Sequence, residues 1–321
     1  MDSNSGIESI FNALWNDLRM EDDFTHPLPL LAHYTSIQTL EGIMANDELW
    51  FSNPLFMNDL DELRFGMNES AQEIRHSQQL KRSCGTEERY KVFMESFEQM
   101  FKEFSEERAF DVYVLCFSEH GESEDDGLLS MWRGYGGNGN GAAVIFDPQK
   151  LNENADSPFL IAKVSYLSTE MRLKWIQKKC DEFSALLINA EVPTDKLHIA
   201  VGKLFERMKI HSLFTKHIGF VEEREWRVAY MREPGKHPEL DEMLHYAIGK
   251  NGVEPKLKLK IKPIEGLATD DFSLEKIVRK IILGPTISSP LAQLAVKRML
   301  QKLGKIEIAK TLAVSTTPFR G

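Results

Sequence analysis

The chain has 321 residues, of which 42% are hydrophobic and 27% charged, and its formal net charge is −10 at pH 7. This composition is typical of a soluble globular protein, and no window approaches the run of about 18 apolar residues that a transmembrane helix needs. Three cysteines are too few for a disulfide framework, and the N-terminal stretch lacks the basic start and apolar run of a secretion signal. We therefore expect a cytoplasmic protein with reduced thiols.

Charge is distributed unevenly along the chain. Residues 1–130 contain 9 Lys/Arg against 27 Asp/Glu, whereas residues 250–321 contain 14 against 6. Such a split indicates either that the two ends bind oppositely charged partners, or that two solvated surfaces partly attract each other. The sequence leaves both possibilities open.

The first part of the chain alternates between helix and strand. The apolar spacing of residues 5–20 predicts an amphipathic helix, and residues 1–28 are assigned to this N-terminal segment. Residues 30–52 then predict a strand, a short helix and a second strand. Ser36 is a good N-cap for that helix, because its hydroxyl can accept hydrogen bonds from the free amides of the first turn.

Charged helices and apolar strands make up the rest of the chain. Strands are predicted at 112–117, 142–146, 160–166, 222–230, 256–261, 277–283 and 306–309, and a helix at 290–303. No long linker divides the sequence. We therefore predict a single α+β domain over residues 29–312, with helical insertions at 58–110 and 168–213 and a tail at 313–321.

Several common kinds of chemistry find no support in the sequence. The nine histidines form no HxH or HExxH pattern, so no metal site is predicted. The glycine-rich stretch 134–141 precedes a strand instead of joining a strand to a helix, which argues against a dinucleotide-binding fingerprint. It is interpreted as a flexible turn, or as a backbone that approaches a ligand closely. No serine lies in a Gly-x-Ser-x-Gly elbow, so a hydrolase triad is not predicted.

A carboxylate on a late strand is the best remaining candidate for chemistry. If residues 222–230 form a strand, Glu223, Glu225 and Arg227 share one face, and Trp226 and Val228 face the core. Taken alone, a glutamate beside an arginine on a strand is more often a structural ion pair than a functional group.

Several motifs, taken in order, resemble a bacterial family known as domain of unknown function 2971. The likeness runs from about residue 30 to residue 312. The opening strand and helix also resemble the start of DarT-like ADP-ribosyltransferases. The motifs that carry the resemblance are His33-Tyr34-Thr35-Ser36, Leu49 to Pro54, Asn58-Asp59, Cys116-Phe117-Ser118, Met131-Trp132 with Tyr135, Glu223 with Glu225-Trp226-Arg227, and Ile281 to Pro285.

The second resemblance implies an ADP-ribosyltransferase-like split β-sheet core with helical insertions, and NAD as the substrate without a metal. By this resemblance His33 would hold the adenosine-side ribose, and Ser52 or Tyr34 would contact the nicotinamide. Glu225 or Glu223 would be the catalytic carboxylate. The remaining candidates for NAD binding are Thr35, Asn53, Trp132 and Tyr135. The segment Ser52-Asn53-Pro54 departs from the Ser-Thr-Ser pattern usual in that family.

The resemblance implies an NAD-dependent ADP-ribosyltransferase that acts as a toxin-like effector in a bacterial conflict or phage-defence system. The acceptor would be nucleic acid, with RNA favoured, or protein. The protein would bind an antitoxin or another neutralising partner. It would not associate with a membrane. A phosphate-facing surface would be formed by Lys256, Lys258, Lys260, Lys262, Arg279, Lys280, Lys297, Arg298, Lys302 and Lys305. The alternatives are a non-catalytic nucleotide-sensing or interaction module, and an NAD glycohydrolase.

Overall fold

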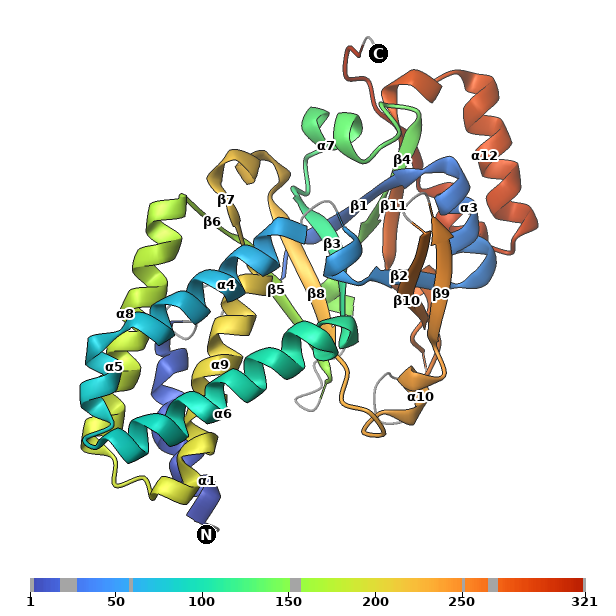
Figure 1. The fold of residues 1–321 in the computed structure, drawn as a ribbon. Helices are drawn as coiled ribbons and strands as arrows, with labels where there is room; N and C mark the ends of the chain where they lie inside the picture. Colours follow the sequence, from blue (N-terminus) through green and yellow to red (C-terminus); the bar gives the residue numbers. More distant parts are fainter. Residues whose placement is uncertain are drawn as a thin grey trace. The chain divides into compact units, whose positions relative to one another are not determined.

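A computed structural model describes residues 3–17, 28–57, 60–150, 157–249, 252–264 and 271–319 of the chain (Figure 1). The chain forms two compact units, each made of three separate stretches. The first unit contains Met1–His26, Pro54–Asp111 and Ser165–Gly219, and the second contains Pro27–Asn53, Val112–Val164 and Phe220–Gly321. Both predicted helical insertions fall in the first unit together with the N-terminal segment, a division that the single-domain prediction did not include.

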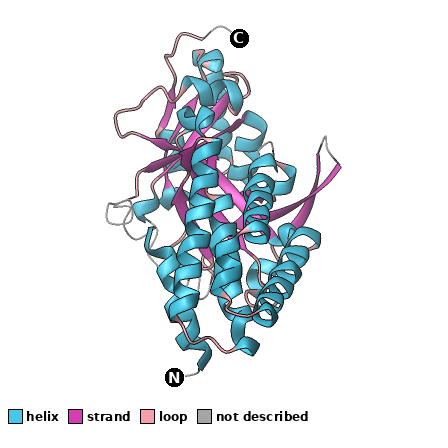
Figure 2. Ribbon diagram, turned by 60° about the vertical axis from the view of Figure 1, so that its left-hand side comes forward, coloured by secondary structure: helices cyan, strands magenta, loops and turns pink. Residues whose placement is uncertain are grey.

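The first unit is mainly helical, and Figure 2 shows its long helices running side by side. The helices are α1 (Ser3–Phe11), η1 (Asn12–Trp15), η3 (Pro54–Phe56), α4 (Leu60–His76), α5 (Gln78–Ser83), α6 (Glu87–Glu106), η4 (Arg108–Asp111), α8 (Thr169–Asn189), η6 (Thr194–Lys196) and α9 (Leu197–Leu213). Two short parallel strands, β6 (Ser165–Leu167) and β7 (Thr215–His217), complete the unit.

An aromatic core holds these helices together. Phe183 of α8 lies with its ring centroid 5.1 Å from that of Phe11 and 5.8 Å from that of Phe93. The N-terminal segment is also tied down by charge, because Asp17 forms ion pairs with the buried Arg207 at 2.6 Å and the buried Lys179 at 3.2 Å. The predicted helix over 5–20 is thus observed through α1 and η1, while residues 18–27 lie outside the described part of the chain.

The second unit is built on a ten-stranded mixed sheet. Its strands are β1 (Leu30–Ser36), β2 (Glu48–Ser52), β3 (Val112–His120), β4 (Gly141–Phe146), β5 (Phe159–Lys163), β8 (Glu225–Met231), β9 (Leu244–Gly249), β10 (Gly252–Lys260), β11 (Val278–Leu283) and β12 (Leu312–Val314). The main path runs β12-β11-β4-β1-β3-β2-β10-β9, and β8 pairs with both β3 and β5. The predicted α+β class is confirmed.

Two clusters of apolar side chains lie on opposite faces of this sheet. Leu31 and the helices α3 (Ile37–Asn46), α12 (Pro290–Lys302) and α13 (Ile306–Lys310) contribute to one cluster. Ala32, the next residue of β1, contributes to the other, together with α7 (Leu129–Gly134). We call these the α3 face and the α7 face. The remaining short helices are η5 (Pro148–Lys150), η7 (Ile218–Glu223), α10 (Pro238–Asp241), α11 (Leu274–Ile277) and η8 (Pro285–Ile287).

The sheet forks at β3. Residues 30–32 of β1 pair with residues 118–120 of β3, and Ser52 of β2 pairs with Val114 further back on the same strand. The opposite edge of β3 is filled by β8 over residues 112–118. Strands β1 and β2 therefore share one edge of β3 and diverge along it, joined by α3.

One predicted strand is a helix in the structure, and one observed strand was not predicted. The strand predicted at 306–309 is the helix α13, in which Ile308 and Ala309 are buried while Ile306 is exposed. A short apolar run with alternating residues fits one helical turn as well as a strand. The edge strand β9 was not predicted. Its large apolar side chains Tyr246 and Ile248 are exposed, so the segment has no apolar face that packs on a core.

Candidate functional site

The start of β8 lies against the end of β3, and the two strands hold each other there by side-chain and backbone bonds. Ser118 stands opposite Glu225 in the register, and its hydroxyl donates to the backbone carbonyl of Glu223 at 2.7 Å. The backbone N–H of Glu119 donates to the carbonyl of Arg224 at 2.8 Å. The two segments that carry the predicted Cys-Phe-Ser and Glu-x-Glu motifs are therefore neighbours.

The strand begins at Glu225, not at residue 222 as predicted. Residues Ile218–Glu223 form the 3-10 helix η7, and Arg224 has a left-handed backbone with φ 45°. Glu223 consequently does not follow the alternation of the strand. Within β8 the alternation is as predicted, since Trp226 belongs to the α3-face cluster, and Glu225 and Arg227 lie on the α7 face.

Glu225 and Arg227 form a buried ion pair. The Arg227 Nε donates to Glu225 Oε1 at 2.6 Å, and its Nη2 donates to Oε2 at 3.1 Å. Glu225 is 4% exposed and Arg227 is 5% exposed. A carboxylate held this way has much of its charge balanced by its partner. Glu225, the leading catalytic candidate, thus lies in a buried bidentate ion pair.

Glu223 is in a different environment. Its carboxylate is half-buried, and Oε1 accepts a hydrogen bond from the Tyr135 hydroxyl at 3.1 Å. Tyr135 follows α7 and is 42% exposed. Two predicted site residues that are far apart in the sequence therefore meet, with an aromatic ring and a carboxylate both reaching the surface.

Trp132 and Tyr34 pack against each other in the core of the second unit. Trp132 is fully buried, and its indole N–H donates to the carbonyl of Asp126 at 2.8 Å. Tyr34 meets it edge to face with ring centroids 4.9 Å apart, and its hydroxyl accepts from the N–H of Leu128 at 2.8 Å. Burial raises the pKa of Tyr34 to about 12. Both rings are thus packed in the core of the α7 face, and their predicted contact with NAD stays a prediction.

His33 lies in the fork of the sheet. Its Nδ1 is 3.1 Å from the carbonyl oxygen of Cys116, and its ring packs edge-on against Phe117 with centroids 5.9 Å apart. Burial lowers the pKa of His33, which favours the neutral imidazole. The ring thus satisfies a β3 carbonyl at the point where β1 turns away.

The structure does not bring His33 and Glu225 onto one face. Ala32, Ser118 and Glu225 lie in one row across three strands, so their side chains share the α7 face. His33 is the next residue of β1 and therefore points to the α3 face. The sequence could not show this, because the strand register decides which residues share a face.

The other predicted NAD contacts support the sheet. Thr35 is buried on the α3 face, and Asn53 is buried with its amide donating to the carbonyl of Val112 at 2.9 Å. The Ser52 hydroxyl accepts from the Lys256 ammonium at 2.9 Å. Ser52 stands opposite Val114, four residues along β3 from Ser118, which is about 13 Å at the usual rise of a strand. Asn58-Asp59, also quoted above, lies outside the described residues.

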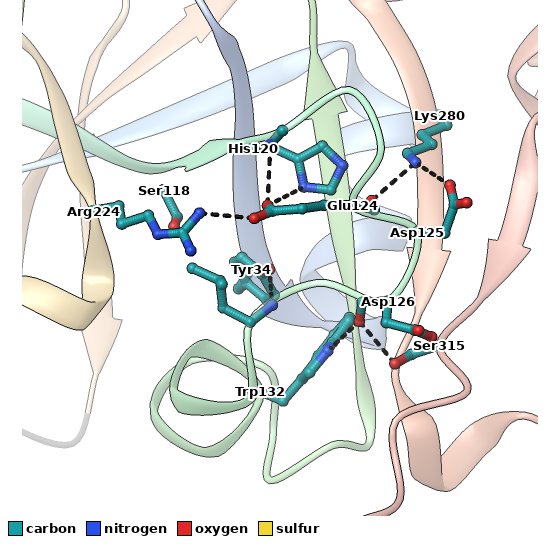
Figure 3. A network of polar contacts seen from close by, with 12 residues as sticks. Tyr34, Ser118, His120, Glu124, Asp125, Asp126, Trp132, Arg224, Lys280 and Ser315 are labelled. Carbon is teal, nitrogen blue, oxygen red and sulfur yellow. Dashed lines mark hydrogen bonds and ion pairs between the residues drawn. The ribbon is translucent and has the colours of Figure 1, made fainter.

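An acidic loop between β3 and α7 contacts both Arg224, the residue before β8, and Lys280 of β11 (Figure 3). Glu124 Oε1 pairs with Arg224 Nη1 at 2.7 Å, and Asp125 pairs with Lys280 at 3.0 Å. The Asp126 carbonyl accepts from the Ser315 hydroxyl at 2.7 Å. Burial raises the pKa of Glu124, but its hydrogen bonds and the Arg224 charge outweigh this, so its pKa lies below the usual value. Sequence reasoning missed Glu124 and Arg224, whose only signal was opposite charge.

The contacts within the second unit bear on the uneven charge of the sequence. Besides the Asp125–Lys280 pair, Glu48 pairs with Lys260 at 2.7 Å, and Asp47 pairs with Lys305. Acidic residues of the first part of the chain thus attract basic residues of the last part. Lys297, Arg298 and Lys302 on α12 are exposed.

The glycine-rich stretch before β4 is a tight turn packed on its neighbours. Gly137, Asn138 and Gly139 have left-handed backbones. A Cβ on Gly141 would come within 2.2 Å of the Thr35 carbonyl oxygen. The stretch therefore provides close approach between backbones of the protein itself.

Comparison with known proteins gives one match. Residues 131–228 match the model of a family described as "Protein of unknown function (DUF2971)", and this stretch includes both Tyr135 and the Glu223–Arg227 segment. No curated protein and no solved structure matches the chain. Within the described residues, no helix is long and apolar enough to cross a membrane, and no cluster of three or more His, Cys, Asp or Glu could hold a metal.

Proposed function

We propose that this chain is an NAD-consuming ADP-ribosyltransferase in which Glu223 is the reacting carboxylate. The observation that carries this proposal is the 3.1 Å contact between the Tyr135 hydroxyl and Glu223 Oε1. It joins two motifs of the family resemblance that lie at opposite ends of the stretch matched by the family model. Both groups reach the surface, where a substrate can meet them.

The chemistry suits a carboxylate beside an aromatic ring. The bond between C1′ of the ribose and the nicotinamide nitrogen breaks, and nicotinamide leaves with the bonding electrons. Positive charge then develops on the ribose, and a nearby carboxylate stabilises it more in the transition state than in the ground state. The acceptor forms its bond to C1′ and loses a proton. Tyr135 can provide a stacking surface, since planar rings favour aromatic side chains.

Glu223 is preferred over Glu225 on grounds of access. Glu225 is buried and accepts both hydrogen bonds of the Arg227 fork, whereas Glu223 is half-buried at the end of η7. We assign Glu225 a positioning role, in which its pair with Arg227 fixes the start of β8. His33, predicted to hold the adenosine-side ribose, lies on the opposite face of the sheet from Ser118 and Glu225.

An ADP-ribosyltransferase-like core is part of the proposal. Support comes from the fork at β3, where β1, α3 and β2 form a strand-helix-strand unit on one edge of the sheet. The DarT-like resemblance rests on the same unit. We further propose a toxin-like effector with a nucleic-acid or protein acceptor and a neutralising partner. Within the predicted basic surface, Lys260, Lys280 and Lys305 are paired with acidic residues, whereas Lys297, Arg298 and Lys302 on α12 are exposed and available to nucleic acid.

The test is release of nicotinamide from NAD by the purified full-length chain. Glu223→Gln should reduce the rate by about 100-fold or more, as expected for loss of one electrostatic stabiliser. Glu222→Gln is the matched control, because Glu222 is the exposed neighbour, and it should keep the wild-type rate. Absence of nicotinamide release by the wild-type chain, or full activity of Glu223→Gln, would reject the proposal.

Labelled NAD separates transfer from hydrolysis. Incubation with total RNA, DNA or lysate protein should place the label on one of these acceptors. Label recovered only as free ADP-ribose would instead indicate an NAD glycohydrolase.

A non-catalytic nucleotide-sensing or interaction module is the second candidate. It is favoured by the number of charged groups around β8 that already have partners, including Glu119, which pairs with Lys163 at 2.8 Å. Nucleotide binding without nicotinamide release, measured by calorimetry with NAD, would support this alternative.

A further inference from the structure

Arg224 has a backbone conformation that its side chain does not favour. Among the described residues, three that are not glycine have positive φ, namely Asp47, Asn138 and Arg224. Asp and Asn tolerate the left-handed region because their short polar side chains can bond locally, whereas Arg has no such advantage. The conformation of Arg224 therefore needs support from its surroundings.

The left-handed residue separates the two carboxylates of the site. It ends η7 at Glu223 and starts β8 at Glu225, so that Glu223 turns to Tyr135 and Glu225 to Arg227. The Arg224 N–H donates to the Val221 carbonyl at 3.2 Å, and its own carbonyl accepts from Glu119 at 2.8 Å. A change of φ at this residue would shift Glu223 relative to the sheet.

Glu124 is placed to provide the support. Its Oε1 accepts from Arg224 Nη1 at 2.7 Å, and its Oε2 accepts from the Gly121 N–H at 3.0 Å. The buried ring of His120 lies on the same carboxylate, with Nδ1 3.7 Å from Oε2 (Figure 3). The Gly121 N–H thus holds one oxygen of the Glu124 carboxylate, and the other oxygen accepts from the guanidinium.

We propose that Glu124 is a positioning residue that holds Arg224 in its left-handed conformation and thereby sets the place of the Glu223 carboxylate. This inference rests on the proposed function for its effect on catalysis. Its structural part concerns only the turn at Arg224, and can be measured without NAD.

The experiment combines Glu124→Gln with Arg224→Gly in the full-length chain. Glu124→Gln should lower kcat for nicotinamide release about 10- to 100-fold with little change in KM for NAD, because a small displacement of a reacting group has effects of this size. Glycine adopts positive φ without support. The double variant should therefore recover most of the kcat that the single variant loses. Asp125→Asn, which removes the Lys280 pair and leaves Arg224 untouched, should have wild-type kcat.

Amide hydrogen exchange provides the readout that does not depend on activity. The Glu119 N–H, bonded to the Arg224 carbonyl, should exchange faster in Glu124→Gln and return toward the wild-type rate in the double variant. Unchanged exchange at Glu119 in Glu124→Gln, or a double variant no better than the single one, would overturn the inference. If the wild-type chain releases no nicotinamide, the proposed function fails, and the exchange comparison alone decides the role of Glu124.

Discussion

The guanidinium of Arg227 forms a bidentate ion pair with the carboxylate of Glu225, two residues earlier on the same strand. Its Nε is 2.6 Å from Oε1 and its Nη2 is 3.1 Å from Oε2. The pair is buried on the face that also carries Ser118. A pair in this setting makes removal of one member costly, because the other charge stays buried without its partner.

We expect Arg227→Met to lower the free energy of unfolding by about 3–5 kcal/mol. The double variant Glu225→Leu with Arg227→Met should be closer to the wild type, because it buries no unpaired charge. Urea unfolding followed by circular dichroism measures both. A double variant that is less stable than Arg227→Met would show that the pair itself, and not the orphaned charge, dominates.

Arg172 and Arg207 in the first unit should respond differently to the same substitution. Both are buried, but Arg207 pairs with Asp17, whereas Arg172 Nε has no hydrogen-bond partner and the guanidinium lies over the Phe65 ring at 4.3 Å. We expect Arg172→Met to be neutral or stabilising and Arg207→Met to cost about 3–5 kcal/mol. Thermal unfolding of the two variants, measured side by side, checks the contrast, and a large loss at Arg172 contradicts it.

His211 should make the stability of the first unit depend on pH. Its ring is stacked on Trp175 with centroids 3.5 Å apart, and burial together with the Arg207 charge lowers its pKa from 6.5 to about 3. The unfolded chain takes up a proton as the pH falls through 6.5, whereas the folded chain stays neutral, so stability is full above that pH and decreases below it. The loss between pH 7.5 and 5.5 should be about 1.4 kcal/mol. His211→Phe keeps the stacking and should remove this part of the pH dependence of the urea midpoint.

Two glycines on either side of Tyr135 offer a matched test of backbone packing. A Cβ at Gly141 would meet the Thr35 carbonyl oxygen at 2.2 Å, whereas a Cβ at Gly134 would meet nothing within 4 Å. We expect Gly141→Ala to destabilise the sheet by about 1–3 kcal/mol through overpacking, and Gly134→Ala to be neutral or slightly stabilising. Equal melting temperatures for the two variants would be inconsistent with this packing.

The sequence predicted local features better than spatial ones. The alternation of side chains along β8 was predicted, because apolar and polar residues alternate at Trp226, Arg227 and Val228. The place of Glu223 was not, because the left-handed φ of Arg224 interrupts that period. The face of His33 depends on the register of β1 against β3, which is a property of the whole sheet.

The burial of aromatic side chains near the site could not be predicted from the sequence either. Trp132 and Tyr135 lie three residues apart next to one glycine-rich stretch, yet one is fully buried and the other 42% exposed. Their residue types are equally suited to packing and to ligand binding. Only the position of Tyr34 and the Asp126 carbonyl around Trp132 decides between the two.

The connection between β5 and β8 has a consequence for how the chain folds. These paired strands are separated in sequence by residues 164–224, and the parallel pairing of β6 with β7 joins the two ends of the intervening helices. If β6 and β7 associate first, the remaining loop to be closed is short. Since closure entropy grows with the logarithm of loop length, this order lowers its cost by roughly 1–2 kcal/mol. We therefore expect that pairing of β6 with β7 before β5 meets β8 speeds the completion of the sheet.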